Sequence, residues 1–246
     1  MDRLGYIAMT GATHTMRAQA VVSNNLANIS TTGFRAELVA ADSAPIYGDV
    51  HPSRVNVVTA GYGADFSAGA IMPTGRDLDV AINGEGFIGV QAPDGQEAYT
   101  RAGDFYIDTL GMLKTANGLP VMGDGGPVAV PPNSSLTIGA DGTISVVPLG
   151  QPSNALAIVD RIRLVNPPTQ ELARGRDGLF RMKGGETAEA DASVTLVTGS
   201  LETSNVNASA ALVEMIELSR TYEMQIKTIE TARDDADRAA QLMRLS

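Results

Sequence analysis

The chain has 246 residues, of which 43% are hydrophobic, and its formal net charge is −10 at pH 7. This hydrophobic content excludes a wholly disordered protein, and the length allows one large or two modest domains. The acidic balance argues against a nucleic-acid partner, because no basic stripe is present to displace counterions from a phosphate backbone. There is no cysteine, and His14 and His51 are the only histidines, so the chain offers little material for a zinc site.

The N-terminal segment lacks a basic region followed by a continuous apolar run, so it does not resemble a cleaved signal peptide. No stretch approaches the roughly 18 apolar residues that a membrane-spanning helix needs. If the protein is exported, we expect another route.

Small residues repeat at spacings of three and four at the start of the chain, which predicts a helix ending near Asn28. They are Leu4, Ala8, Gly11, Thr15, Ala18 and Val22. Glycine inside a helix costs about 1 kcal/mol relative to alanine, so Gly11 suggests the close approach of another backbone. Additional apolar residues, Met9 and Met16 among them, predict contacts on more than one side of this helix.

Residues 207–245 read as one long helix with a narrow heptad seam. The seam consists of Leu212, Met215, Ser219, Tyr222, Ile226, Ile229, Arg233, Ala236, Ala240 and Met243. Such a seam predicts packing against another long helix, from this chain or from a neighbouring subunit. The alternative is an ordinary solvated helix that closes a single-domain core.

The middle of the chain is typical of β structure. Residues 36–75 are interrupted by Pro and Gly and predict an irregular extended arm, whereas residues 77–91 alternate as strand, turn and strand. Turn signals recur at 93–95, 117–118 and 141–142. We therefore predict an α+β fold with four segments: an N-terminal helix in 1–34, a connecting arm in 35–76, an all-β domain in 77–202 and a C-terminal helix in 203–246.

Two patterns in the β region imitate functional sites. Gly84, Gly86 and Gly89 spell the glycine fingerprint of dinucleotide-binding folds, but strand and turn residues follow where a helix should open. A nucleotide-binding enzyme is therefore only a remote alternative. Asp77 and Asp79 alternate along a strand, and we expect both to face solvent.

Four stretches together resemble the rod and hook family of bacterial flagellar axial proteins. They are SNNLANISTTGF at 23–34, DLDVAINGEGFIGV at 77–90, YTRAGDFYID with its continuation to LPVMG at 99–123, and LETSNVNASAALVEMIELSRTYEMQIKTIETA at 201–232. The chain length and the start MDRLGYIAMTGA favour the proximal-rod branch of this family. The distal-rod branch is the alternative, because both branches share the terminal motifs.

The resemblance implies that the two terminal helices pair into an inner coiled-coil domain that packs against neighbouring subunits. It places assembly contacts at Asn24, Asn25, Leu26, Ala27, Asn28, Thr31, Gly33, Phe34, Ser204, Asn205, Val206 and Asn207, and along the seam at Leu212, Met215, Tyr222, Ile226 and Ile229. Helix capping is the alternative role for several of these, since Asn28 and Gly33 suit the turn after the first helix and Asn207 suits an N-cap. We expect Phe34 to anchor the arm to the helix pair.

The resemblance also implies a structural protein without catalytic residues, cofactor, metal or small-molecule substrate. Its expected partners are other proximal- and distal-rod subunits and the flagellar type III export apparatus. We expect it in the basal-body rod that crosses the periplasm, exported from the cytoplasm without a cleaved signal peptide.

Overall fold

The computed structural model describes residues 2–45, 55–152 and 155–244. They fall into two compact units, and the chain passes between them at 28–29, 35–36, 65–66 and 205–206. The helical unit comprises the described parts of 1–28, 36–65 and 206–246, and the β unit comprises those of 29–35 and 66–205. The predicted α+β class is therefore confirmed. The boundaries differ from the predicted four segments, because 29–35 belongs to the β unit and 36–65 to the helical unit.

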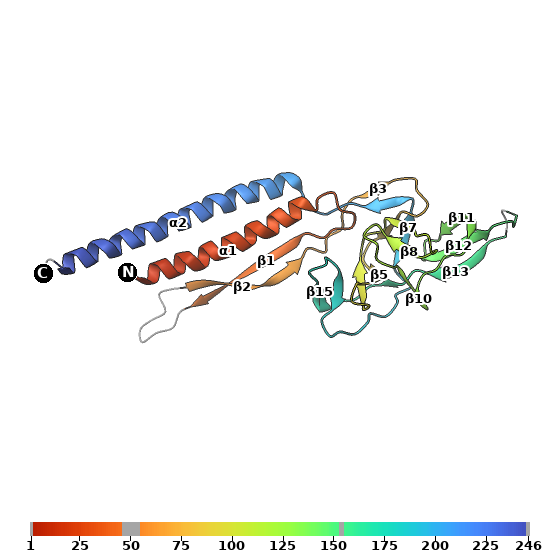
Figure 1. The fold of residues 1–246 in the computed structure, drawn as a ribbon, viewed down its shortest axis with the longest axis horizontal. Helices are drawn as coiled ribbons and strands as arrows, with labels where there is room; N and C mark the ends of the chain where they lie inside the picture. The colour runs from red at the N-terminus through yellow and green to blue at the C-terminus, as the bar shows by residue number, and fades with distance from the viewer. Residues whose placement is uncertain (1, 46–54, 153–154, 245–246) are drawn as a thin grey trace. The chain divides into compact units, whose positions relative to one another are not determined.

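The helical unit contains two antiparallel helices, α1 (Asp2–Ala27) and α2 (Ala208–Arg244), with a β-hairpin beside α1 (Figure 1). Asn207 caps α2 as predicted: its side-chain Oδ1 accepts a hydrogen bond of 3.1 Å from the Ala210 N–H. Neither described helix contains an apolar stretch sufficient to cross a membrane.

Gln225 of α2 makes a direct contact with α1. Thr15 donates a hydrogen bond of 3.1 Å from Oγ1 to Gln225 Oε1, and a Cβ added at Gly11 would lie 2.9 Å from Gln225 Nε2. Gly11 is therefore small because a side chain of the other helix lies over it. Ala8, Thr15 and Val22 are buried along α1, as their spacing predicts.

The C-terminal seam is only partly as predicted. Its members Met215, Tyr222, Ile226 and Ile229 are partly buried, but Leu212 is 48% exposed and Ala211 is the buried residue in that turn. A seven-residue repeat drifts relative to a straight helix of 3.6 residues per turn. The predicted seam therefore runs through Leu212, one residue away from the buried Ala211. Beyond Ala232, the predicted seam residues Arg233, Ala236, Ala240 and Met243 are exposed.

The predicted irregular arm is instead a hairpin where the structure describes it; residues 46–54 lie outside the described ranges. Strand β1 (Glu37–Pro45) pairs antiparallel with β2 (Val55–Ala64), with a register shift between Ala40 and Ala41. The Asn25 side chain joins the hairpin to α1, since its Nδ2 donates to Glu37 O at 2.9 Å and its Oδ1 accepts from Glu37 N at 2.8 Å. Glycine and proline obscured this strand pairing in the sequence.

The β unit is built of short antiparallel strands around one main apolar core (Figure 1). A five-stranded sheet has the order β14 (Leu164–Val165), β5 (Phe87–Gln91), β6 (Glu97–Thr100), β16 (Phe180–Met182) and β15 (Leu172–Arg174). A three-stranded sheet consists of β11 (Asn133–Ile138), β12 (Thr143–Pro148) and β13 (Ala157–Arg161).

Four strand pairs and one short helix complete this unit. The pairs are β3 (Ile71–Pro73) with β18 (Ser200–Glu202), β4 (Val80–Asn83) with β17 (Thr195–Thr198), β7 (Phe105–Ile107) with β8 (Leu113–Thr115), and β9 (Met122–Gly123) with β10 (Gly126–Pro127). A 3-10 turn, η1, covers Thr169–Glu171. The alternating apolar residues of β4 and β5, including Val80, Ile82 and Ile88, lie in the core.

The glycine fingerprint forms a turn between β4 and β5. Gly84 has φ of 91° and Gly86 has φ of 121°, conformations that favour glycine. Gly89 lies within strand β5, so no helix begins at this glycine that could point its N-terminus at a pyrophosphate. The structural interpretation of these glycines is therefore confirmed.

The expectation that Asp77 and Asp79 both face solvent is wrong for Asp79. Asp77 is exposed, but Asp79 is only 4% exposed. Its carboxylate accepts a hydrogen bond of 2.7 Å from Thr74 Oγ1 and pairs with Arg76 at 2.9 Å. Asp79 thus fixes the segment between β3 and β4.

Candidate functional site

The two terminal motifs meet inside the β unit. The Gly33 N–H donates to Glu202 O at 2.8 Å, and the Asn205 N–H donates to Phe34 O at 3.3 Å. Gly33 has φ of 65°, and a Cβ there would lie 2.3 Å from the carbonyl carbon of Arg101. Only glycine fits this position, because the conformation and the space both exclude a side chain.

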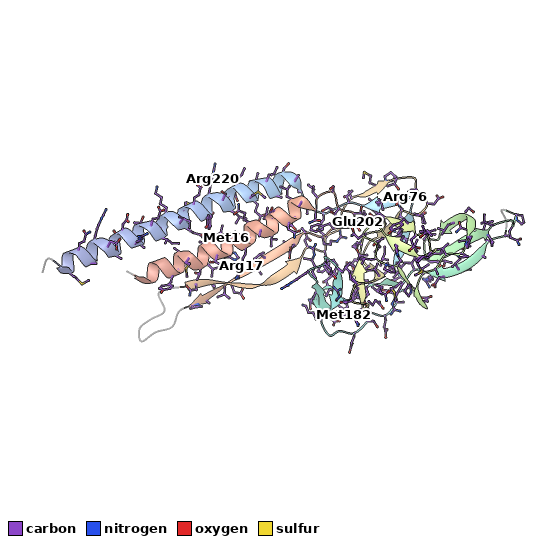
Figure 2. The ribbon with its side chains drawn as sticks, in the orientation of Figure 1. Met16, Arg17, Arg76, Met182, Glu202 and Arg220 are labelled. Carbon is purple, nitrogen blue, oxygen red and sulfur yellow. The ribbon has the colours of Figure 1, made fainter. Side chains whose placement is uncertain are left out.

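A buried ion cluster joins these motifs to the middle of the chain; Figure 2 labels Glu202, its central residue. Glu202 pairs through Oε1 with Arg35 and through Oε2 with Arg101, each at 2.7 Å. The side chain of Arg35 is 0% exposed, that of Glu202 is 1% exposed and that of Arg101 is 4% exposed. Gly69 N also donates to Glu202 Oε1 at 2.8 Å. Two guanidinium groups on one carboxylate give a short, rigid connection between three distant segments.

Arg101 extends the cluster to the glycine turn. Its guanidinium donates to Gly84 O at 2.7 Å and to Gly86 O at 3.2 Å. Burial lowers the pKa of Arg101 from its ordinary value, while the Glu202 carboxylate acts in the opposite direction. The carbonyl groups of the fingerprint turn are therefore acceptors for an internal arginine.

Phe34 and Asn205 both make contacts within the β unit. The Arg174 guanidinium lies 4.5 Å above the Phe34 ring and donates to Arg35 O at 2.7 Å. Asn205 Nδ2 donates to Ser67 O at 3.0 Å. Phe34 thus anchors its segment to the β unit, whereas the sequence led us to expect the helix pair.

The remaining motif residues cluster less tightly. Asn28 Nδ2 donates to Asn24 Oδ1 at 2.8 Å at the end of α1. Asn24, Ala27 and Thr31 are exposed, while Leu26, Ser204 and Val206 are partly buried. The predicted seam residues of α2 are those described above, with Leu212 exposed. The structure thus collects Gly33, Phe34 and Asn205 around one buried cluster, places Thr31 and Ser204 elsewhere in the β unit, and leaves the others in the helical unit.

The sequence motifs did not single out Arg35, Arg101 or Glu202. Charged residues are almost never fully buried unless they are paired, so charge alone predicted solvent exposure. In the sequence, two features could have pointed to this cluster: Arg35 directly follows the Gly33-Phe34 turn, and Glu202 lies within a short strand. Neither indicates a partner 167 positions away.

A cavity of about 470 Å³ lies beside the cluster. Phe66, Phe87, Pro167 and Pro168 contribute its apolar wall, and Arg101 and Glu85 are its ionisable residues. The Arg101 guanidinium is already bonded to Glu202 and to the glycine turn. No group of three or more potential metal-binding side chains gathers within the described ranges.

Both helices also carry apolar side chains on their outward faces. On α1 we call Tyr6, Met9 and Met16 the α1 outer stripe, with exposed fractions of 59%, 51% and 56%. Val213, Ile216 and Met224 form the α2 outer stripe and are 56%, 54% and 62% exposed. Figure 2 shows Met16 and Arg220 on these two helices. These large apolar residues recur at helical spacing and lie outside the contact between α1 and α2.

Comparisons with known proteins match three parts of the chain, and each part contains one residue of the buried ion cluster. Residues 6–35 match a family model described as flagella basal body rod protein, residues 81–146 match the D1 domain of the flagellar hook protein FlgE/F/G, and residues 197–242 match the C-terminal model of the flagellar basal body rod FlgEFG protein. The flagellar basal-body rod protein FlgF of Escherichia coli strain K12 is 44% identical over the full length of both chains.

The chain belongs to the FlgE/F/G family of flagellar rod and hook proteins. FlgF of Salmonella typhimurium is 43% identical, again over the full length of both chains. FlgG of Buchnera aphidicola subsp. Schizaphis graminum is 34% identical over 96% of this chain and 98% of its own. In this FlgE/F/G-family chain the buried cluster takes one residue from each matched part: Arg35, Arg101 and Glu202.

Proposed function

We propose that this protein is a structural subunit of the proximal rod of the bacterial flagellar basal body. The observation that carries the proposal is the 44% identity with FlgF of E. coli along the whole of both chains. Because the match leaves no part of either chain uncovered, it supports a role for the helical unit and the β unit together.

The helical unit supplies the assembly contacts in this proposal. The helix pair buries one face of each helix and leaves the two outer stripes exposed. In a rod these stripes pack against neighbouring rod subunits, which become the principal partners. We place the protein in the basal body, where the rod crosses the periplasm, and infer export through the flagellar type III apparatus without a cleaved signal peptide.

The buried cluster suits a subunit of a drive shaft that transmits torque. Segments 29–35 and 201–205 lead directly into chain connections to the helical unit. Glu202 ties both segments to Arg101 within the β unit. Buried charge-assisted bonds hold a fixed geometry better than exposed loops do. The role requires neither catalysis nor a cofactor.

Purified basal bodies test this proposal. An epitope-tagged copy replaces the chromosomal gene in the source bacterium, motility is checked, and intact basal bodies are imaged with a gold-labelled antibody. We expect label on the rod, at its end nearer the cytoplasm. A motile strain whose purified basal bodies lack the tagged protein would overturn the proposal.

The distal-rod role is the second candidate, supported by the identity with FlgG of Buchnera over nearly all of both chains. The same experiment separates the two roles. Label at the end of the rod nearer the hook would favour the distal position.

A further inference from the structure

Unused hydrogen-bonding groups surround the cavity beside the buried ion cluster. Its lining includes the polar side chains of Glu85, Asn166, Thr169 and Gln170, and all of these residues are exposed. None of these side chains forms a hydrogen bond or an ion pair with any residue that the structure describes. Their donors and acceptors are therefore available to a ligand in the cavity.

Exposed polar side chains in other turns of the β unit bond to the turn itself. Asp94 Oδ1 accepts a hydrogen bond of 3.0 Å from the Gln96 N–H, and Asp177 Oδ1 accepts one of 3.1 Å from the Leu179 N–H. Short polar side chains usually form such local bonds in turns. The side chains around the cavity thus hold bonding capacity that the fold does not use.

The same cavity has an apolar wall. Phe66 is partly exposed and packs edge-on against the buried Phe87, with 6.1 Å between the ring centroids. Pro167 and Pro168 complete this wall. The volume of about 470 Å³ falls within the range of about 300–1,000 Å³ that is usual for ligand sites. An apolar wall with a few convergent polar groups is also the usual composition of such a site.

The charges around the cavity favour a neutral ligand. Its ionisable residues, Arg101 and Glu85, carry opposite charges, and the Arg101 guanidinium already bonds to Glu202. The remaining polar side chains are two amides and one hydroxyl, which both donate and accept hydrogen bonds. A neutral ligand with many hydroxyl groups offers the matching donors and acceptors.

A peptide fits this cavity less well than such a ligand. An extended peptide is commonly held by main-chain hydrogen bonds to the edge of a sheet. Pro167 and Pro168 have no backbone N–H, so this wall of the cavity cannot donate those bonds. Recognition here depends on side chains, as hydroxyl groups of a compact ligand require.

We propose that the cavity binds a neutral glycan that contains N-acetylated sugars. The C–H groups of one sugar ring pack on Phe66, and its hydroxyl groups bond to the polar side chains that surround the cavity. The acetamido methyl group contacts Pro168, which is exposed beside them. This binding activity goes beyond the proposed structural role and does not rest on it.

Saturation-transfer NMR on the purified full chain tests the proposal, with chitotriose as the probe. We expect transfer to the ring protons and to the acetyl methyl groups of chitotriose. Maltotriose, a trisaccharide without acetamido groups, should receive clearly less. Isothermal titration calorimetry then gives the dissociation constant for chitotriose.

Two substitutions connect the binding to the cavity. Asn166→Ala and Gln170→Ala should each raise the dissociation constant roughly twofold to tenfold, as expected for the loss of one hydrogen bond. Gln151→Ala is the matched control, because Gln151 is an exposed glutamine that does not line the cavity. The melting temperatures of all three variants should equal that of the wild type, since neither cavity side chain has a partner among the described residues.

Three results would overturn the proposal. The first is the absence of transfer to chitotriose at millimolar concentration. The second is an unchanged dissociation constant in both cavity variants, or equal binding of maltotriose. The third is transfer to a decaproline peptide but not to the sugar, which would assign the cavity to a peptide. None of these results bears on the rod assignment, which the imaging of basal bodies tests separately.

Discussion

Arg35 and Glu202 form an ion pair of 2.7 Å in which both side chains are almost completely buried, although the residues are 167 positions apart. Arg101 occupies the other carboxylate oxygen at the same distance. Removal of one partner from a buried ion pair costs about 3–5 kcal/mol, because it leaves uncompensated charge in a low-dielectric interior. The stability of the β unit therefore depends on contacts between both ends of the chain and its middle.

Glu202→Gln should lower the free energy of unfolding by about 3–5 kcal/mol, since two guanidinium groups then lack a counter-charge. Urea unfolding of the full chain, followed by circular dichroism, measures the change. Glu85→Gln is the matched control at an exposed carboxylate and should change little. Equal stability of the two variants would show that the cluster does not hold the β unit together.

Gly33→Ala should destabilise the protein more than Gly84→Ala. Both glycines have positive φ, which costs an L residue about 1–2 kcal/mol. At Gly33 the new Cβ also meets the Arg101 backbone at 2.3 Å, while nothing lies within 4 Å of a Cβ at Gly84. Melting temperatures of the two variants provide the comparison. The reverse order would contradict the close packing of the signature segment.

Ile226→Asp should separate the helix pair, because a partly buried apolar side chain is replaced by a charge without a partner. We expect a loss of helical signal in circular dichroism and loss of the protein from purified basal bodies. Thr228→Asp places the same charge at an exposed position nearby. Normal swimming of the Ile226→Asp strain would be incompatible with the helix packing.

Asp104→Asn should stabilise the protein more at pH 7 than at pH 4. Burial raises the pKa of Asp104 above its ordinary value, and the nearby Asp79 carboxylate raises that pKa further. Because the folded-state pKa is raised, protonation of Asp104 stabilises the folded state, and this stabilisation is complete at pH values below the ordinary pKa. It is lost as the pH rises through the folded-state pKa, where the buried carboxylate becomes charged.

The measurement for Asp104 is the difference in melting temperature between variant and wild type at the two pH values. Asp77→Asn removes one negative charge at an exposed neighbouring position and serves as the control. A difference for Asp104→Asn that is the same at both pH values would mean that its carboxyl is not desolvated in the folded state.

Local patterns predicted the elements whose signal lies in adjacent residues. Heptad spacing predicted both helices, period-two alternation predicted β4 and β5, and Asn207 predicted the start of α2. The glycine turn was also interpreted correctly, because a helix must follow the fingerprint directly if it binds a nucleotide. Within 35–76 the hairpin of β1 and β2 was missed, since glycine and proline weakened its alternation and its contact with α1 through Asn25 is not local in the sequence.

By itself the sequence determined the two helices, the β character of the middle and the resemblance to flagellar axial proteins. All three follow from local spacing or from contiguous motifs. Only the tertiary structure decided that Arg35, Arg101 and Glu202 meet, that Phe34 lies under Arg174, and which helix faces are left exposed. The physical reason is that a buried charge is stable only with its partners, and those partners are chosen by chain folding across distances over which local sequence carries no signal.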